Sequence, residues 1–142
     1  MLRGRFESAG KLSPEELQEA YEDALTETVE HVGVETVAEQ SGVDEKRLRA
    51  LTAAESPELT LEEATAILGT DAELPDAETI EAEARDILLM GMSVAVLDVE
   101  AIASGINDEL EPKEIQQKAE GRFPMTIGEY ALLHSYIEGE KR

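Results

Sequence analysis

The stretch from Val37 to Leu51 constrains the fold of this chain more than any other. Its sequence, VAEQSGVDEKRLRAL, is typical of two short helices joined by a tight turn. Gly42 can adopt the positive φ that such a turn needs. Asp44 can cap the second helix by accepting hydrogen bonds from its free N–H groups. Leu48 and Leu51 recur at helical spacing, which predicts that one face of this second helix is buried.

The spacing within this stretch is that of a helix-turn-helix: the small residue Ala38, Gly42 four positions later, the plug residue Val43, then Leu48 and Leu51. Over roughly thirty residues the sequence resembles the Cro/C1-type (repressor-like) helix-turn-helix family. The resemblance implies an all-α unit whose second helix enters the major groove of DNA.

Further helix starts are marked by capping boxes, in which Ser or Thr is followed three residues later by Glu. Such boxes begin at Ser13, Thr60 and Thr126. Asp76 is a further N-cap candidate. Residues 70–75 (TDAELP) form the most convincing linker, and residues 1–12 are predicted to be a short arm.

The helical pattern after the linker repeats the one before it. VEAIAS at residues 99–104 matches VETVAE at residues 34–39, an offset of 65, and Thr126 follows Thr60 by 66. Similar helices in the same order at a near-constant offset are typical of an internal duplication. We therefore predict an all-α tandem repeat of about eight helices. Residues 1–69 form the first unit, and residues 76–142 a second, degenerate unit that packs with it as one globule.

The family signature is divided between the two predicted units. Ile115–Arg122 (IQQKAEGR) resembles the recognition helices of the family. The turn before it, Ile106–Glu111, is two residues longer than the first turn, and Lys118 stands where the family buries an apolar side chain. The second unit therefore departs from the family pattern in its turn and in its core.

The candidate DNA-contacting residues follow from the angular period of a helix. Lys46, Arg49 and Ala50 lie opposite the buried leucines, on the face that the family presents to base edges. Arg can bond guanine through two hydrogen bonds, and Ala permits close approach. Arg47 is the predicted phosphate contact, although it can instead pair with a nearby carboxylate.

The second unit adds two residues of the adenine-reading type, Gln116 and Gln117. Glu35, Glu39 and Glu45 oppose DNA binding, because they lie close to where family members touch phosphates. The leading prediction is a DNA-binding transcriptional regulator. The alternative is a helical protein-interaction module that retains the helix-turn-helix scaffold without binding DNA, since a fold alone does not decide function.

Acidic residues dominate the charge: 33 Asp and Glu stand against 12 Lys and Arg, a formal net charge of −21. This composition fits an acidic partner-binding protein or adaptation to molar intracellular salt. The acids are spread along the helices, which favours salt adaptation, and the chain looks like a member of a small haloarchaeal family of unknown function. At molar salt the Debye length falls to about 3 Å, so net charge neither excludes nor supports DNA binding.

Catalysis is not predicted, because the chain has no phosphate loop, zinc-protease or nucleophile motif. The absence of cysteine excludes disulfides and thiolate metal sites. His31 and His134 each have a Glu at helical spacing, but with so many acids these pairings are expected by chance, and both histidines are predicted to face solvent. No cofactor and no metal are expected.

The run Ile87–Leu97 (ILLMGMSVAVL) is hydrophobic nearly all round, which predicts a helix buried on most faces. It is either the central helix on which both units pack or the seam of a homodimer. It is too short to span a bilayer, and the N-terminal residues lack the apolar segment of a signal peptide. We therefore expect a soluble, cytoplasmic protein without a membrane partner, whose partner is DNA or another protein.

Overall fold

The computed structural model describes residues 5–141, and all the regular secondary structure in that range is helical. The described residues form one short 3-10 helix and eight α-helices, so the all-α prediction and the predicted helix number are confirmed. The elements are η1 (Ala9–Lys11), α1 (Pro14–Val32), α2 (Val34–Ser41), α3 (Glu45–Thr52), α4 (Leu61–Leu68), α5 (Ala77–Ala95), α6 (Val99–Gly105), α7 (Pro112–Ala119) and α8 (Ile127–Glu140).

The capping boxes predicted from the sequence open α1, α4 and α8. Ser13, Thr60 and Thr126 each accept a hydrogen bond from the backbone N–H three residues later. The Glu carboxylate at that later position accepts one from the backbone N–H of the cap residue. Asp76 caps α5 in the simpler way, by accepting from the backbone N–H of Thr79 at 2.8 Å. These local interactions satisfy N–H groups that the helices leave free.

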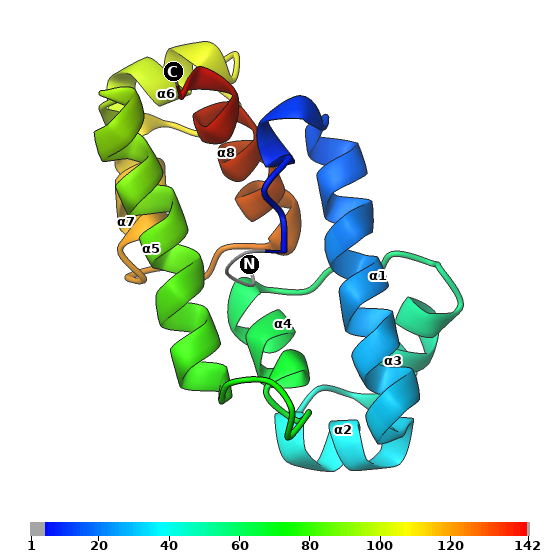
Figure 1. Ribbon diagram of the computed structural model, residues 1–142. Helices are drawn as coiled ribbons and strands as arrows, with labels where there is room; N and C mark the ends of the chain where they lie inside the picture. Colours follow the sequence, from blue (N-terminus) through cyan, green and yellow to red (C-terminus); the bar gives the residue numbers. More distant parts are fainter. Residues whose placement is uncertain (1–4, 142) are drawn as a thin grey trace.

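The two sets of four helices follow the same order, but they do not form separate bodies. Helices α4 and α8 lie at the centre, with α1 on one side and α5 on the other (Figure 1). Helix α1 packs chiefly along α8, from the other half of the chain, and α5 packs on both α4 and α8. The core is therefore shared between residues 1–69 and 76–142. An origin by duplication stays a prediction.

The segments leading into the two central helices pair with each other. The Leu61 backbone N–H donates to the Met125 carbonyl at 2.7 Å, and the Ile127 N–H donates to the Leu59 carbonyl at 2.9 Å. These two hydrogen bonds form an isolated antiparallel bridge. The bridge joins equivalent positions of the two halves at the middle of the molecule.

The prediction that Ile87–Leu97 is buried on most faces is wrong. Helix α5 lies at the edge of the molecule, so α4 and α8 cover only one of its sides (Figure 1). Its inward side chains are buried: Ile80, Ala84 and Leu88. Its outward apolar side chains are exposed: Leu89, Met90 and Val94, followed by Val96 just beyond the helix.

The two histidines differ in environment. His31 is exposed, as predicted, but His134 is 3% exposed, so the prediction that it faces solvent is wrong. His134 lies on α8, which α1 and α5 cover from opposite sides. Its ring stacks on Tyr21 of α1, and its Nδ1 is hydrogen-bonded to the Tyr21 hydroxyl. Tyr130 packs against both rings, so an aromatic cluster joins the two halves of the chain.

Gly69, at the C-terminal end of α4, marks the closest approach between α4 and α5. A Cβ atom at this position would lie 2.6 Å from the backbone nitrogen of Ala77, the first residue of α5. We expect Gly69→Ala to lower the free energy of unfolding by roughly 2 kcal/mol, because the two helices must separate to make room. Urea unfolding followed by circular dichroism measures this change.

Gly128→Ala is the matched control for this substitution. A Cβ at Gly128, in the first turn of α8, would meet only the end of the flexible Gln18 side chain, at 3.1 Å. Its effect should lie between neutral and slightly stabilising, because Ala favours helix over Gly. If both variants lost the same unfolding free energy, the close contact between Gly69 and Ala77 would not be the cause of the destabilisation.

Candidate nucleic-acid interface

Helices α2 and α3 are the two short helices, joined by a tight turn, that the sequence predicts. Gly42 is in the left-handed region, with φ 78° and ψ 3°, and its N–H donates to the carbonyl of Ala38 at 3.1 Å. Val43 is buried beneath the turn. Asp44 Oδ1 accepts a hydrogen bond from the Lys46 backbone N–H at 2.7 Å. The turn residues therefore fix the entry into α3.

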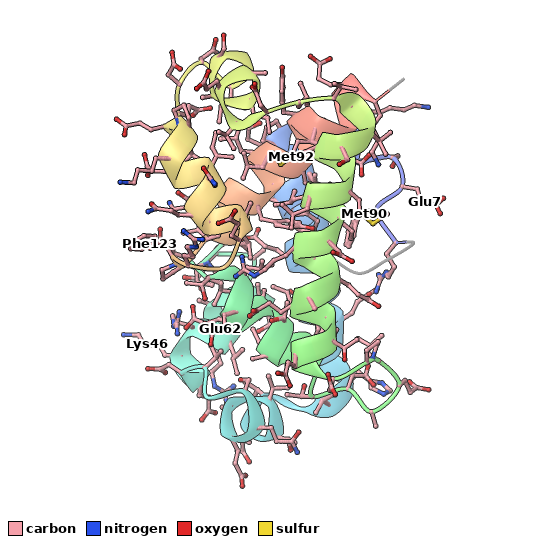
Figure 2. The ribbon with its side chains drawn as sticks, turned by 90° about the vertical axis from the view of Figure 1, so that its left-hand side faces the viewer. Glu7, Lys46, Glu62, Met90, Met92 and Phe123 are labelled. Atoms are coloured by element: carbon pink, nitrogen blue, oxygen red, sulfur yellow. The ribbon has the colours of Figure 1, made fainter. Side chains whose placement is uncertain are left out.

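The inner face of α3 is held by Leu48 and Leu51, which are buried as predicted, in contact with α1 and α2. The opposite face carries the predicted base-contacting residues Lys46, Arg49 and Ala50. Lys46 projects away from the body of the molecule (Figure 2). Residues 76–141 do not cover this side chain.

The cationic side chains of α3 differ in the contacts that they make within the fold. Lys46 makes no ion pair with any of residues 5–141. Arg49 is largely exposed, and its Nη2 lies 2.6 Å from Glu45 Oε1 one turn earlier. Such an exposed pair within one helix contributes little to stability. Lys46 and Arg49 are therefore available to a partner at small cost.

Arg47 is engaged inside the fold. Its guanidinium binds both oxygens of the Glu63 carboxylate, and its Nη1 lies 3.3 Å from the Glu58 carbonyl. The hydrogen bond with Glu63 raises the pKa of Arg47 and lowers that of Glu63. This is the internal pairing that the sequence left as the alternative to a phosphate contact. Arg47 fastens α3 to α4.

Lys118 plays a corresponding part in the second half. Its Nζ binds the Glu129 carboxylate and lies 3.9 Å from Glu114, and the side chain is only 16% exposed. Glu129 closes the capping box of α8, as Glu63 closes that of α4. A buried cation with paired carboxylates thus replaces the apolar side chain expected at this position. It fastens α7 to α8.

The two adenine-type residues of α7 are placed differently from each other. Gln116 is exposed and lines a shallow groove of about 310 Å³ with Leu89 and Met92 of α5. Gln117 is half-buried, and its carbonyl accepts a hydrogen bond from the Arg122 backbone N–H at 2.9 Å. Only Gln116 is therefore fully open to a partner.

Helices α3 and α7 lie on the same side of the molecule. Both run along the left edge in Figure 2, whereas in Figure 1 α7 lies behind α5 and α3 lies beside α1, at the opposite edge of the view. The turn before α7 is longer than that before α3, and Asn107 and Asp108 within it adopt left-handed conformations. The helix pairs α2–α3 and α6–α7 therefore differ in the geometry of their turns.

A family model matches residues 17–140, which include every helix from the first turn of α1 to the end of α8. Its description is "Family of unknown function (DUF5791)". The chain belongs to the DUF5791 family. Searches of the curated proteins and of the solved structures returned no match to this member of the family.

The electrostatics around α3 of this DUF5791 protein are mixed. Residues 34–52 carry the three cations of α3 and four carboxylates. Glu35 and Glu39 are exposed on α2, and Glu45 is paired with Arg49. The positive charge is therefore confined to the outward edge of α3, and it can act on a polyanion only at short range.

One cluster in the described part of this family member brings together possible metal ligands. A ring nitrogen of His31 and carboxylate oxygens of Asp71 and Glu73 lie within 4.8 Å of one another. His31 contacts Glu73, at 3.6 Å, and not the Glu27 to which its helical spacing points. Asp71 Oδ1 accepts a hydrogen bond from the Glu73 backbone N–H at 2.9 Å. The cluster ties the end of α1 to the turn before α5.

No single helix among residues 5–141 is long and apolar enough to cross a membrane. The bent pair α5 and α6, whose axes meet at 93°, passes that test of length and composition only when the two are taken together.

Proposed function

We propose that this DUF5791 protein is a DNA-binding transcriptional regulator of a halophilic archaeon, with α3 in the major groove. The observation that carries the proposal is the exposure of Lys46 and Arg49 on the outer face of α3, in a segment whose sequence resembles the repressor-like helix-turn-helix. Lys46 has no internal partner among residues 5–141, and Arg49 has only an exposed one. A free cationic edge on the outer helix of such a motif fits recognition of base edges.

Each residue of the α3 face has a distinct part in this proposal. Arg49 and Lys46 bond guanine or phosphate oxygens, and Ala50 allows the helix to approach the bases. Arg47 is left out, because contact with phosphate would require breaking its pair with Glu63. Gln116, on the same side of the molecule, is the second-unit contact, and Gln117 supports it from a half-buried position.

The acidic surface makes the salt dependence of binding unusual. In dilute buffer, a chain with a net charge of −21 is repelled by DNA. At molar salt the Debye length is about 3 Å, so this repulsion is screened and only groups in contact with DNA count. The same salt removes most of the counterion-release contribution. Selective binding must therefore come from direct contacts of the α3 face.

Replacing both free cations of α3 by acids should abolish selective DNA binding. We expect Lys46→Glu/Arg49→Glu to bind its preferred genomic fragments at least about tenfold more weakly than the wild type, because two direct contacts become repulsive. Selection of genomic fragments in about 1 to 3 M KCl, where long-range repulsion is screened, followed by fluorescence anisotropy on the enriched fragments, measures the loss.

The matched control is Arg5→Glu/Lys11→Glu, which changes the net charge equally. Lys11 lies in η1, which packs on α8, and Arg5 pairs with Glu27 at 3.4 Å on α1. These positions are outside the α3 face, so the control should bind as the wild type does. Absence of selective binding by the wild type, or equal binding by all three proteins, would refute the DNA proposal.

A second candidate function is a protein-interaction module that keeps the helix-turn-helix as scaffold. The exposed apolar side of α5 favours it, because contiguous exposed apolar surface marks interaction sites. This surface lies on a different side from Lys46 (Figure 2), so the two functions do not exclude each other.

A further inference from the structure

The outward side of the C-terminal half of α5 is an apolar surface without charge. Leu89, Met90, Val94 and Val96 are 41%, 57%, 60% and 88% exposed, respectively. We call these four residues, with the exposed Ser93 among them, the α5 face. No charged residue occurs from 87 to 97, the longest such stretch in a chain with 33 carboxylates. The helix lies in front in Figure 2, and Met90 and Met92 project from opposite sides of it.

Val96 ends α5 as its C-cap residue, and the backbone N–H groups of Val96 and Leu97 donate to the carbonyls of Ser93 and Met92 at 3.2 and 2.9 Å. It follows α5 with φ 55° and ψ 52°, in the left-handed region. This conformation costs a residue with a Cβ roughly 1 to 2 kcal/mol, and a β-branched side chain is particularly unfavourable there. Val96 is also the most exposed large apolar residue described. Strained residues of this kind cluster at binding sites.

The α5 face combines a projection with a hollow. Val96 projects beside a shallow hollow of about 540 Å³, lined by Leu89, Met92, Ser93, Val96, Leu97 and Asp98. In a two-fold symmetric contact, each copy presents both features to the other. The projecting Val96 of one copy can therefore enter the hollow of its partner, and the reverse contact forms at the same time.

We infer that the α5 face binds the α5 face of a second copy of this chain, with the two helices antiparallel and Ser93 near the two-fold axis. The charge of the chain favours a second copy as the partner of the α5 face. In a two-fold contact the same patch of both copies meets, so a patch of a single charge sign would oppose like charges. At a net charge of −21, an uncharged patch is the surface on which two copies can meet. A basic partner would favour the carboxylate-rich surfaces instead.

The affinity of this dimer depends on the size of the α5 face and on the charged residues at its two ends. Four exposed apolar side chains form a patch of functional size but only a small interface core. Asp86 and Asp98 bound the uncharged stretch at its two ends. Each copy carries a formal net charge of −21. Salt screens the repulsion between the two copies, so association should strengthen as KCl rises.

The inference is independent of the proposed DNA function. Lys46 projects along the left edge of Figure 2, whereas the α5 face is turned toward the viewer. A dimer formed through α5 therefore leaves α3 uncovered, and loss of either property would not remove the other.

Sedimentation equilibrium of the full chain in about 0.1, 1 and 3 M KCl tests the inference. We expect the wild type to be monomeric at the lowest salt and increasingly dimeric above it. Val94→Ser/Val96→Asn should weaken dimerisation at least tenfold, and Asn tolerates the left-handed conformation at 96. Phe123→Ser removes an apolar side chain that is 51% exposed in the α7–α8 connection, and it should dimerise as the wild type does.

A cross-linking measurement checks the position of the two-fold axis. The chain has no cysteine, so Ser93→Cys introduces a single thiol where two copies should meet. Under mild oxidation in 3 M KCl it should form disulfide-linked dimers, unlike the exposed control Ser104→Cys on α6. A wild type that is monomeric at every salt concentration, or equal cross-linking of both cysteine variants, would overturn the inference.

Discussion

Fragments 1–74 and 75–142, each studied alone, are expected to lack a cooperatively folded structure. The long helix of each half packs along a helix of the other half: α1 along α8, and α5 along α4. Leu17 and Tyr21 of α1 are fully buried, and Tyr21 packs against Tyr130 and His134 of α8. Exposing one such side chain costs roughly 1.5 to 3 kcal/mol, and a domain is stable by only about 5 to 15 kcal/mol. Losing the whole interface should therefore unfold each fragment.

The measurement is far-UV circular dichroism during urea titration of each fragment and of their equimolar mixture. The separate fragments should show low helix content without a sigmoidal transition, and the mixture should regain both. As a control, the full chain cleaved at a protease site inserted into residues 70–75 should keep its structure, because that connection lies outside the regular helices. Cooperative unfolding of either fragment alone would show that the halves are independent domains.

Local sequence signals predicted the elements that local interactions build. Gly42 predicted the left-handed turn residue, and the Ser or Thr with Glu three positions later predicted the starts of three helices. Leu48 and Leu51 identified the buried side of α3. In each case the decisive partner lies within a few residues along the chain, so spacing alone carries the information.

The sequence predicted less well where the answer depends on distant partners. Ile87–Leu97 is apolar on all sides, but periodicity does not reveal that only one side of α5 has helices to pack against. His134 lies at helical spacing from Glu138, a pattern that also occurs on surface helices. Its burial follows from the central place of α8, which local spacing does not encode.

In the candidate interface, too, the sequence predicted what depends on local spacing but not what depends on distant partners. Helical period placed Lys46, Arg49 and Ala50 on one outward face, and the structure leaves Lys46 uncovered. The choice between a phosphate contact and an internal pair for Arg47 depended on Glu63, 16 residues away on another helix. A carboxylate in a capping box facing a nearby helix would have been the signal for such a pair.

The burial of His134 should make the protein lose stability as the pH falls below neutral. Burial lowers the pKa of His134 to about 3 from an ordinary value of 6.5, and nearby Lys141 acts in the same direction. Burial also raises the pKa of Tyr21, so its hydroxyl stays protonated and donates to Nδ1. The ring proton is then on Nε2, 3.7 Å from the Glu138 carboxylate. The fold therefore holds a neutral imidazole.

The sign of the effect follows from where protons bind. Below pH 6.5 the unfolded chain protonates His134, whereas the folded chain does not do so until about pH 3. The stabilisation is thus complete above pH 6.5 and is lost progressively as the pH falls toward 3. By pH 4.5 the loss due to this one group should be about 3 kcal/mol. Urea unfolding in 2 M KCl between pH 7.5 and 4.5 measures it.

Carboxylates also titrate at the lower end of this range, so the contribution of His134 must be isolated by comparison. In His134→Gln the side-chain oxygen can still accept a hydrogen bond from Tyr21, but the group no longer titrates. Its unfolding free energy should fall less between pH 7.5 and 4.5 than that of the wild type, by about 3 kcal/mol. His31→Gln, at an exposed position, should follow the wild type. If His134→Gln also follows the wild type, His134 is protonated in the fold, and the buried Tyr21–His134 pair does not hold a neutral ring.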